Sequence, residues 1–344
     1  MSVATKHERP GVYSSYEASS LTAAAAGGGS VAVVAAADGT GLEESYQWTS
    51  YSRAAADVGD CALSRMAQAA IRNGAGAVYG IPAGEDYGEA FAVMAALEDV
   101  SVVVCDSTEL AVQQALKTAV LECSDARRER IAVVGGAAGE SVEQLIQRAA
   151  GLNCERVVLT APGKGDSDGG ALCAAAVAGA IAGNTDPALP LGGAQLYGLG
   201  ELEHNYDDGE VNLLVQGGVT PLETLAGACY VVRGVTTRTK TGGAVDATWR
   251  ELTTILVVDE VIPGIRRALR AKFSRAKNTP QSRGAIRSLV MMELEKRVSR
   301  QTIDGYEDVT VSALDSDPTV CLVEFAFTVA HGLNQVWLSA HITV

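Results

Sequence analysis

Between residues 30 and 161, short continuous apolar runs alternate with longer stretches of helical period, and this alternation restricts the fold more than any other feature. A strand that is apolar throughout has no face for solvent, so helices must cover both of its sides. The expected strands lie at residues 31–37, 77–81, 100–105, 130–135 and 156–161, and the expected helices at 61–73, 85–97, 109–123 and 140–150. The fold class that follows is α/β, with an N-terminal α/β domain built on a mainly parallel sheet.

The pattern changes beyond residue 161. A small-residue helix is expected at 170–183, and strands are expected at 211–216 and 229–233. Two long amphipathic helices follow, the first around 249–273 and the second starting at Thr279 and Pro280, a cap and a first-turn proline. Pro263 should kink or split the first of them. With alternating β segments at 309–313 and 321–329, these elements predict a C-terminal α+β domain with two long helices and a small sheet.

The last nine residues alternate between apolar and polar side chains. A strand with a complete apolar face must pair with another strand, because an unpaired edge is a site of association. Two arrangements are open: the strand pairs within its own subunit, or it is donated to a neighbouring subunit. We expect four segments: an N-terminal linker arm at 1–22, an α/β domain at 23–210, a C-terminal α+β domain at 211–330, and a C-terminal arm at 331–344.

Charge is unevenly distributed along the chain. The 344 residues carry a net charge of −14, but residues 1–232 carry −17, residues 233–300 carry +9 and residues 301–344 carry −6. The basic stretch has two interpretations: solvated helix faces, or a docking surface for an acidic partner, which copies of this chain could supply. The overall acidity argues against general nucleic-acid binding, which needs clustered Lys and Arg.

Several other classes are disfavoured. Residues 1–10 lack the apolar core of a signal peptide, and the uncharged runs are too rich in Gly, Ser and Thr for a membrane span, so no membrane insertion is expected. The seven cysteines are scattered without a C-x-x-C pair, which favours reduced thiols in the cytosol.

Searches for an active site find no convincing pattern. The glycines at 39–41 and 135–139 do not fit G-x-G-x-x-G, and the glycine-flanked Ser167 lacks a suitably placed histidine. His204 near Asp207 is the best remaining pair, although an acidic solvated loop explains it more simply. We therefore expect no catalytic, cofactor-binding or metal-binding residue, no cofactor, and no enzyme. The alternative function is an α/β enzyme, nucleotide-binding or a serine hydrolase; another self-associating structural or adaptor protein is also open.

Several short segments follow one another in a distinctive order along the chain. RPGVY at 9–13 leads through small residues into GSVAVV at 29–34. The small-residue helix at 174–183 is followed by the proline-containing 185–190, and RGVTT at 233–237 precedes the two amphipathic helices and the terminal β segment. In this order the segments resemble contractile-tail sheath proteins, which form the sheaths of myovirus tails, R-type bacteriocins and related injection particles. RPGVY and GSVAVV are similar to the start of that family, and the last elements follow the order of its C-terminal domain.

The resemblance implies a structural subunit that polymerises helically around an inner tube and contracts to drive the tube through a target envelope. Its partners would be copies of itself, the inner tail tube protein, and baseplate and tail terminator proteins, without nucleic acid. The particle would be a virion or a phage-tail-like particle assembled in the bacterial cytoplasm. Arms at both ends would add strands to the C-terminal sheets of neighbours. The expected arm residues are Val12, Tyr13, Tyr16, Val336, Trp337, Leu338, Ile342 and Val344, and the expected tube-facing residues are Arg266, Arg267, Arg270 and Lys272.

Overall fold

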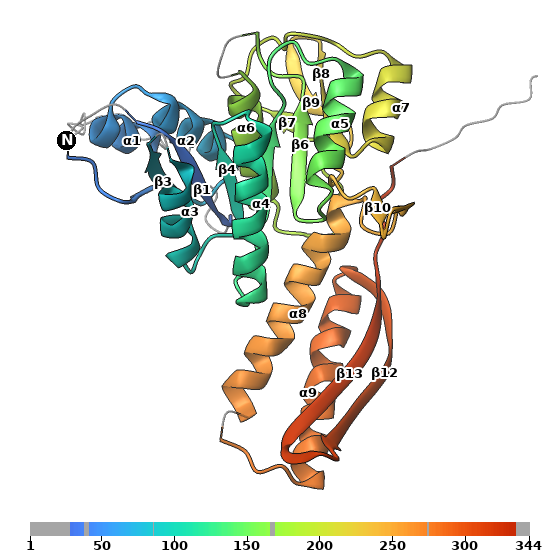
Figure 1. Cartoon of the computed structure of the whole chain (residues 1–344). Helices are drawn as coiled ribbons and strands as arrows, with labels where there is room; N and C mark the ends of the chain where they lie inside the picture. Colours follow the sequence, from blue (N-terminus) through green and yellow to red (C-terminus); the bar gives the residue numbers. More distant parts are fainter. Residues whose placement is uncertain (1–27, 38–40, 85, 166–168, 274, 335–344) are drawn as a thin grey trace, which may run out of the picture.

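The computed structural model describes residues 28–37, 41–84, 86–165, 169–273 and 275–334. A large sheet with helices on both faces forms one part, and a pair of long helices with a β-hairpin extends from its lower edge (Figure 1). The second part is elongated, which leaves much of its surface exposed on several sides.

The large sheet has nine strands in the order β2-β3-β1-β4-β5-β6-β8-β9-β7. The six strands from β3 to β8 run parallel, whereas β2, β9 and β7 pair antiparallel at the two ends. This confirms the predicted parallel sheet. The strands are β1 (Ser30–Ala36), β2 (Tyr46–Trp48), β3 (Ala77–Ala83), β4 (Val102–Cys105), β5 (Ile131–Gly135), β6 (Val157–Ala161), β7 (Gln195–Leu196), β8 (Val219–Leu225) and β9 (Ala228–Val231).

Two hydrophobic cores lie on opposite faces of this sheet. Val31 and Val33 of β1 point into one core, and Ala32 and Val34 point into the other, as the two-residue period of a strand requires. The first core is covered by α1 (Tyr51–Val58), α2 (Ala62–Arg72) and α6 (Gly169–Gly183). The second is covered by α3 (Tyr87–Ala96), α4 (Leu110–Asp125), α5 (Val142–Leu152) and α7 (Asp208–Gln216).

The predicted small-residue helix is α6, which is almost entirely buried between the sheet and α2. Its small side chains let two backbones approach closely. A Cβ added at Gly179 would lie only 2.2 Å from the carbonyl oxygen of Ala70 in α2. Glycine is therefore required at this helix crossing, and α6 has no polar face because every side of it meets protein.

The strand expected at 211–216 is wrong, because these residues belong to helix α7. Asp207 accepts a hydrogen bond from the backbone N–H of Glu210, and the Glu210 side chain accepts one from the N–H of Asp207. This reciprocal cap starts a helix that buries Leu214 and Val215. The strand follows as β8, and β8 and β9 both belong to the nine-stranded sheet, although the sequence placed them in the C-terminal domain.

The extended part consists of α8 (Leu252–Phe273), α9 (Pro280–Ser299), β12 (Ile303–Leu314) and β13 (Asp317–Val329), preceded by the short hairpin of β10 (Lys240–Thr241) and β11 (Ala244–Val245). Thr279 caps α9 by accepting a hydrogen bond from the N–H of Ser282, as its position before Pro280 predicts. α9 lies between α8 and the β12–β13 hairpin, and all three share a third hydrophobic core (Figure 1).

Of the two outcomes expected at Pro263, a kink or a split, the split does not occur, because α8 continues through the proline. Val257, Val261 and Ile265 lie on both sides of the proline and are all buried in the third core, which holds both halves against α9. Arg297 of α9 also donates to the carbonyl of Glu260 and to its carboxylate. Packing against α9 thus stabilises α8 on both sides of the proline, whose missing N–H would have donated to the carbonyl of Asp259. None of the helices in the described ranges is sufficiently long and apolar to span a membrane.

Candidate assembly surfaces

The β12–β13 hairpin forms a sheet of only two strands among the described residues. Exposure alternates residue by residue along the second half of β13, from Cys321 to Val329, and its more buried face, including Val323, Phe325 and Phe327, packs in the core shared with α9. No third described strand pairs with the outer edge of β12 or of β13. Unpaired strand edges present free N–H and C=O groups to any chain that can add a strand.

The predicted arm residues lie outside the described residues at both ends of the chain: Val12, Tyr13, Tyr16, Val336, Trp337, Leu338, Ile342 and Val344. Just before the C-terminal segment, the chain passes close to the loop after α6. A Cβ at Gly332 would lie 1.9 Å from Cγ of Pro190, so only glycine fits here. Leu333 is 79% exposed and the described chain ends one residue later.

The four predicted tube-facing cations differ in their environments. Arg266 donates to a carboxylate oxygen of Glu129 at 2.9 Å, so it connects α8 to the loop before β5. Arg267, Arg270 and Lys272 are exposed and make no ion pair with any described residue. The structure therefore leaves three of the four free on the C-terminal half of α8, and we call these three the basic strip.

α8 is attached to the large sheet by a buried ion pair. Both terminal nitrogens of Arg156, which precedes β6, donate to the carboxylate of Asp259 in α8, at 2.6 and 2.8 Å. Only 12% and 16% of the two side chains are exposed. Burial raises the pKa of the Asp259 carboxyl above its ordinary value, even though the hydrogen bonds from Arg156 act in the other direction. Arg266 with Glu129 is a second, more exposed connection between the same two parts.

A second buried arginine connects α8 to α9. Arg297 donates to the carboxylates of Glu260 at 2.7 Å and Glu293 at 3.2 Å, and its side chain is 6% exposed. It lies flat against α8 where Gly264 has no side chain, since a Cβ there would be 2.0 Å from Nη2 of Arg297. No local pattern indicates these pairs, because the partners Arg156 and Asp259 are 103 residues apart, and Glu260 and Arg297 are 37 apart.

The residues considered for chemistry do not assemble into a site. His204 lies 3.6 Å from the carboxylate of Glu210 on an exposed loop, and Ser167 lies outside the described residues. Burial raises the pKa of the Cys105 thiol to about 12, which makes it a poor nucleophile. Across the described ranges, no group of three or more His, Cys, Asp or Glu side chains could hold a metal ion.

Comparison with known proteins identifies the fold. Among solved structures, the helical sheath of the anti-feeding prophage in its contracted state aligns with a TM-score of 0.73 at 14% identity, covering 98% of this chain and 99% of that one. A sheath tail protein of Listeria innocua aligns with a TM-score of 0.71 at 14% identity, covering 90% and 94%. At such identities, the likeness establishes the shared fold.

The sequence comparisons go further. The curated tail sheath protein of Bacillus phage SP01 is 27% identical over 253 residues, which is 71% of this chain but 43% of that protein, so the chain spans less than half of this relative's length. Residues 82–237 match the phage tail sheath protein central domain, and residues 244–343 match the phage tail sheath C-terminal domain. Together these matches cover most of the chain, which therefore belongs to the phage tail sheath protein family.

Proposed function

We propose that this protein is the structural subunit of a contractile tail sheath, which polymerises helically around an inner tube and contracts to drive that tube through a target envelope. The observation that carries the proposal is the β12–β13 hairpin, whose outer edges have no described partner, in a chain of the tail sheath family. Such a role requires no catalysis, because the work would come from the free-energy difference between two packings of the same subunits.

The terminal segments are proposed to complete the hairpin sheet. In this arrangement the segment containing Tyr13 and Tyr16 and the alternating segment at 336–344 each add a strand to the hairpin of a neighbour. Backbone hydrogen bonds would hold the copies together, and apolar side chains of the added strand would extend the face that packs on α9. Linked in this way, copies could rotate relative to one another without separating.

The basic strip is proposed to face the inner tube. Arg267, Arg270 and Lys272 have no ionic partner among the described residues, so an acidic tube surface could neutralise them. Arg266 would contribute less, because Glu129 already neutralises it. Baseplate and tail terminator proteins would contact the two ends of the polymer, in a virion or a phage-tail-like particle assembled in the bacterial cytoplasm.

The proposed segments need one adjustment. The linker arms at 1–22 and 331–344 are kept, but the boundary at 210 would divide the nine-stranded sheet, which includes β8 and β9. We place it between the end of β9 at Val231 and the start of α8 at Leu252. The two family matches, which end at 237 and begin at 244, support this position.

Two deletions test the proposal, one of residues 336–344 and one of residues 2–16. Each truncated protein should keep the circular dichroism spectrum of the intact chain but fail to form tubes in negative-stain electron micrographs. A control replaces Val245, which is 86% exposed in the β10–β11 hairpin, a sheet that β12 and β13 do not join; Val245→Ser should leave tubes intact. Normal tubes from either truncated protein would refute the role of that arm.

A further inference from the structure

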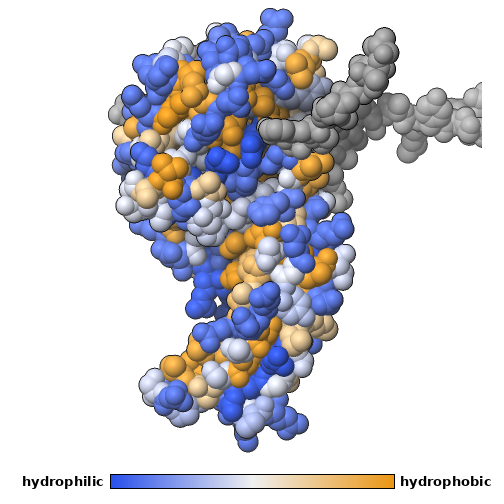
Figure 2. Space-filling view, turned by 90° about the vertical axis from the view of Figure 1, so that its right-hand side faces the viewer, coloured by the Kyte–Doolittle hydropathy of each residue, from blue (hydrophilic) through white to orange (hydrophobic). Residues whose placement is uncertain are grey.

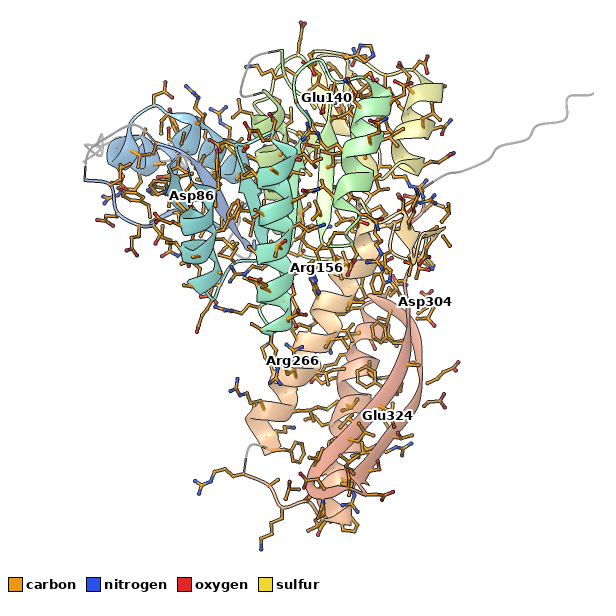
Figure 3. All side chains as sticks on the ribbon, viewed as in Figure 1. Asp86, Glu140, Arg156, Arg266, Asp304 and Glu324 are labelled. Atoms are coloured by element: carbon orange, nitrogen blue, oxygen red, sulfur yellow. The ribbon has the colours of Figure 1, made fainter. Side chains whose placement is uncertain are left out.

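The β12–β13 hairpin carries a strong, unneutralised negative charge. Residues 301–334 contain six acidic side chains and no Lys or Arg. All six are exposed, and none forms an ion pair with another described residue. They are Asp304, Glu307, Asp308, Asp315, Asp317 and Glu324. Figure 3 places Asp304 and Glu324 on the side of the hairpin that faces away from α8.

The basic strip lies on another element of the same unit. Arg267, Arg270 and Lys272 are exposed on the C-terminal half of α8, and α9 packs between α8 and much of the hairpin (Figure 1). No ion pair joins the two charge sets among the described residues. The extended part of each subunit therefore presents exposed, unpaired cations on α8 and exposed, unpaired carboxylates on the hairpin.

We infer that the acidic face of the hairpin docks against the basic strip of a second copy of this chain. Two different surfaces of opposite sign on one subunit can join head to tail, and such heterologous contacts repeat from copy to copy into rings or open helices. The contact would use the outward face of the hairpin. It is thus distinct from the proposed strand addition, which uses the hairpin edges.

Apolar side chains next to these acids favour a protein partner over dissolved cations. Leu314, Val320 and Leu322 on the hairpin are 38%, 41% and 40% exposed. Figure 2, which views the molecule from the hairpin side, shows hydrophobic and hydrophilic residues interspersed over this region. The aliphatic stems of Arg and Lys can cover such apolar surface while their charged ends reach the neighbouring carboxylates.

The inference rests on the proposed function in one respect: in a sheath mounted on its tube, the basic strip would face the tube. The copy-to-copy contact then belongs to subunits that have left the tube, as in a contracted sheath or a polymer formed without one. The basic strip would exchange the acidic surface of the tube for the acidic hairpin of a second copy. This contact between copies would help to stabilise the packing without a tube.

Charge reversal tests this contact in the purified full chain without tube. One variant carries Arg267→Glu, Arg270→Glu and Lys272→Glu, and a second carries Asp304→Lys, Glu307→Lys and Glu324→Lys. Each alone should need about tenfold more protein to assemble, measured by sedimentation velocity and electron microscopy, since three exposed ion pairs become repulsive. Mixing the two variants should restore assembly at the wild-type concentration, because each then offers the charge that the other needs.

A control with the same charge change as the hairpin variant carries Glu44→Lys, Glu122→Lys and Asp125→Lys. These positions are exposed on the α/β part, and the control should assemble like the wild type. Circular dichroism of each variant before mixing verifies folding. Assembly of either reversed variant at the wild-type concentration, or a mixture no better than its components, would overturn the contact while leaving the sheath function standing. Wild-type protein that stays monomeric at every salt concentration would overturn both.

Discussion

Removing the cation from the buried Arg156–Asp259 pair should loosen the attachment of α8 to the large sheet. Because 12% and 16% of these side chains are exposed, Arg156→Met leaves a carboxylate in a site with little access to water. Loss of one partner of a buried pair costs about 3 kcal/mol of unfolding free energy. Urea unfolding of dilute, unassembled protein at pH 7, followed by circular dichroism, measures this loss.

The same variant should show a diagnostic pH dependence. Burial already raises the pKa of Asp259, and without Arg156 the pKa rises further. A carboxyl whose folded pKa exceeds its unfolded value of about 3.9 contributes full stability below that value and loses it as pH rises through the folded pKa. Arg156→Met should therefore be much less destabilising at pH 4 to 5 than at pH 7.

Two further proteins complete the experiment. Adding Asp259→Asn to Arg156→Met should remove this pH dependence, because an amide does not ionise. Arg266→Met serves as the matched control: its side chain is 36% exposed, so losing its pair with Glu129 should cost under about 1 kcal/mol. An equal loss from Arg156→Met at pH 5 and pH 7, or a loss no larger than that of the control, would refute the burial argument.

Two other predictions concern packing and thiols. Gly179→Ala should destabilise the protein by about 2 kcal/mol in urea, because its Cβ meets the backbone of Ala70. Gly284→Ala in α9 should stabilise the protein by up to about 1 kcal/mol, because no described atom lies within 4 Å of the added Cβ. A Gly284→Ala protein less stable than the Gly179→Ala protein would contradict the packing. Six of the seven cysteines are buried, and Cys321 is half-buried. In unassembled native protein, one thiol should thus react with a chromogenic disulfide at pH 8. Rapid reaction of several thiols would contradict the burial of the other six cysteines.

The parallel sheet could be predicted because its signal is local. Each of β1, β3, β4, β5 and β6 is a continuous apolar run between amphipathic helices, and each appeared near its expected position. The strand expected at 211–216 failed for an equally local reason. The capping pair of Asp207 and Glu210 starts a helix there, and an apolar run as short as 213–215 fits either structure.

The candidate assembly surfaces depend on contacts between residues far apart in the sequence, which no local pattern can predict. The resemblance to sheath proteins implied four tube-facing cations in the basic stretch, but the structure shows that Arg266 is engaged by Glu129, 137 residues earlier. The charge reversal near residue 233 was visible in the sequence, yet it could not show that the basic α8 and the acidic hairpin share one core with α9 and form no ion pair with each other among the described residues. That arrangement depends on how the helices and the hairpin pack.

The sequence by itself determined the elements of this protein: the apolar strands, the amphipathic helices, the caps at Ser141 and Thr279, and the uneven distribution of charge. These follow from interactions between residues a few positions apart. Only the tertiary structure decided that Arg156 holds α8 to the sheet and that Arg266 pairs with Glu129 while its three basic neighbours on α8 form no ion pair with a described residue. Such relations join residues distant in sequence, and burial fixes them only once the chain has folded.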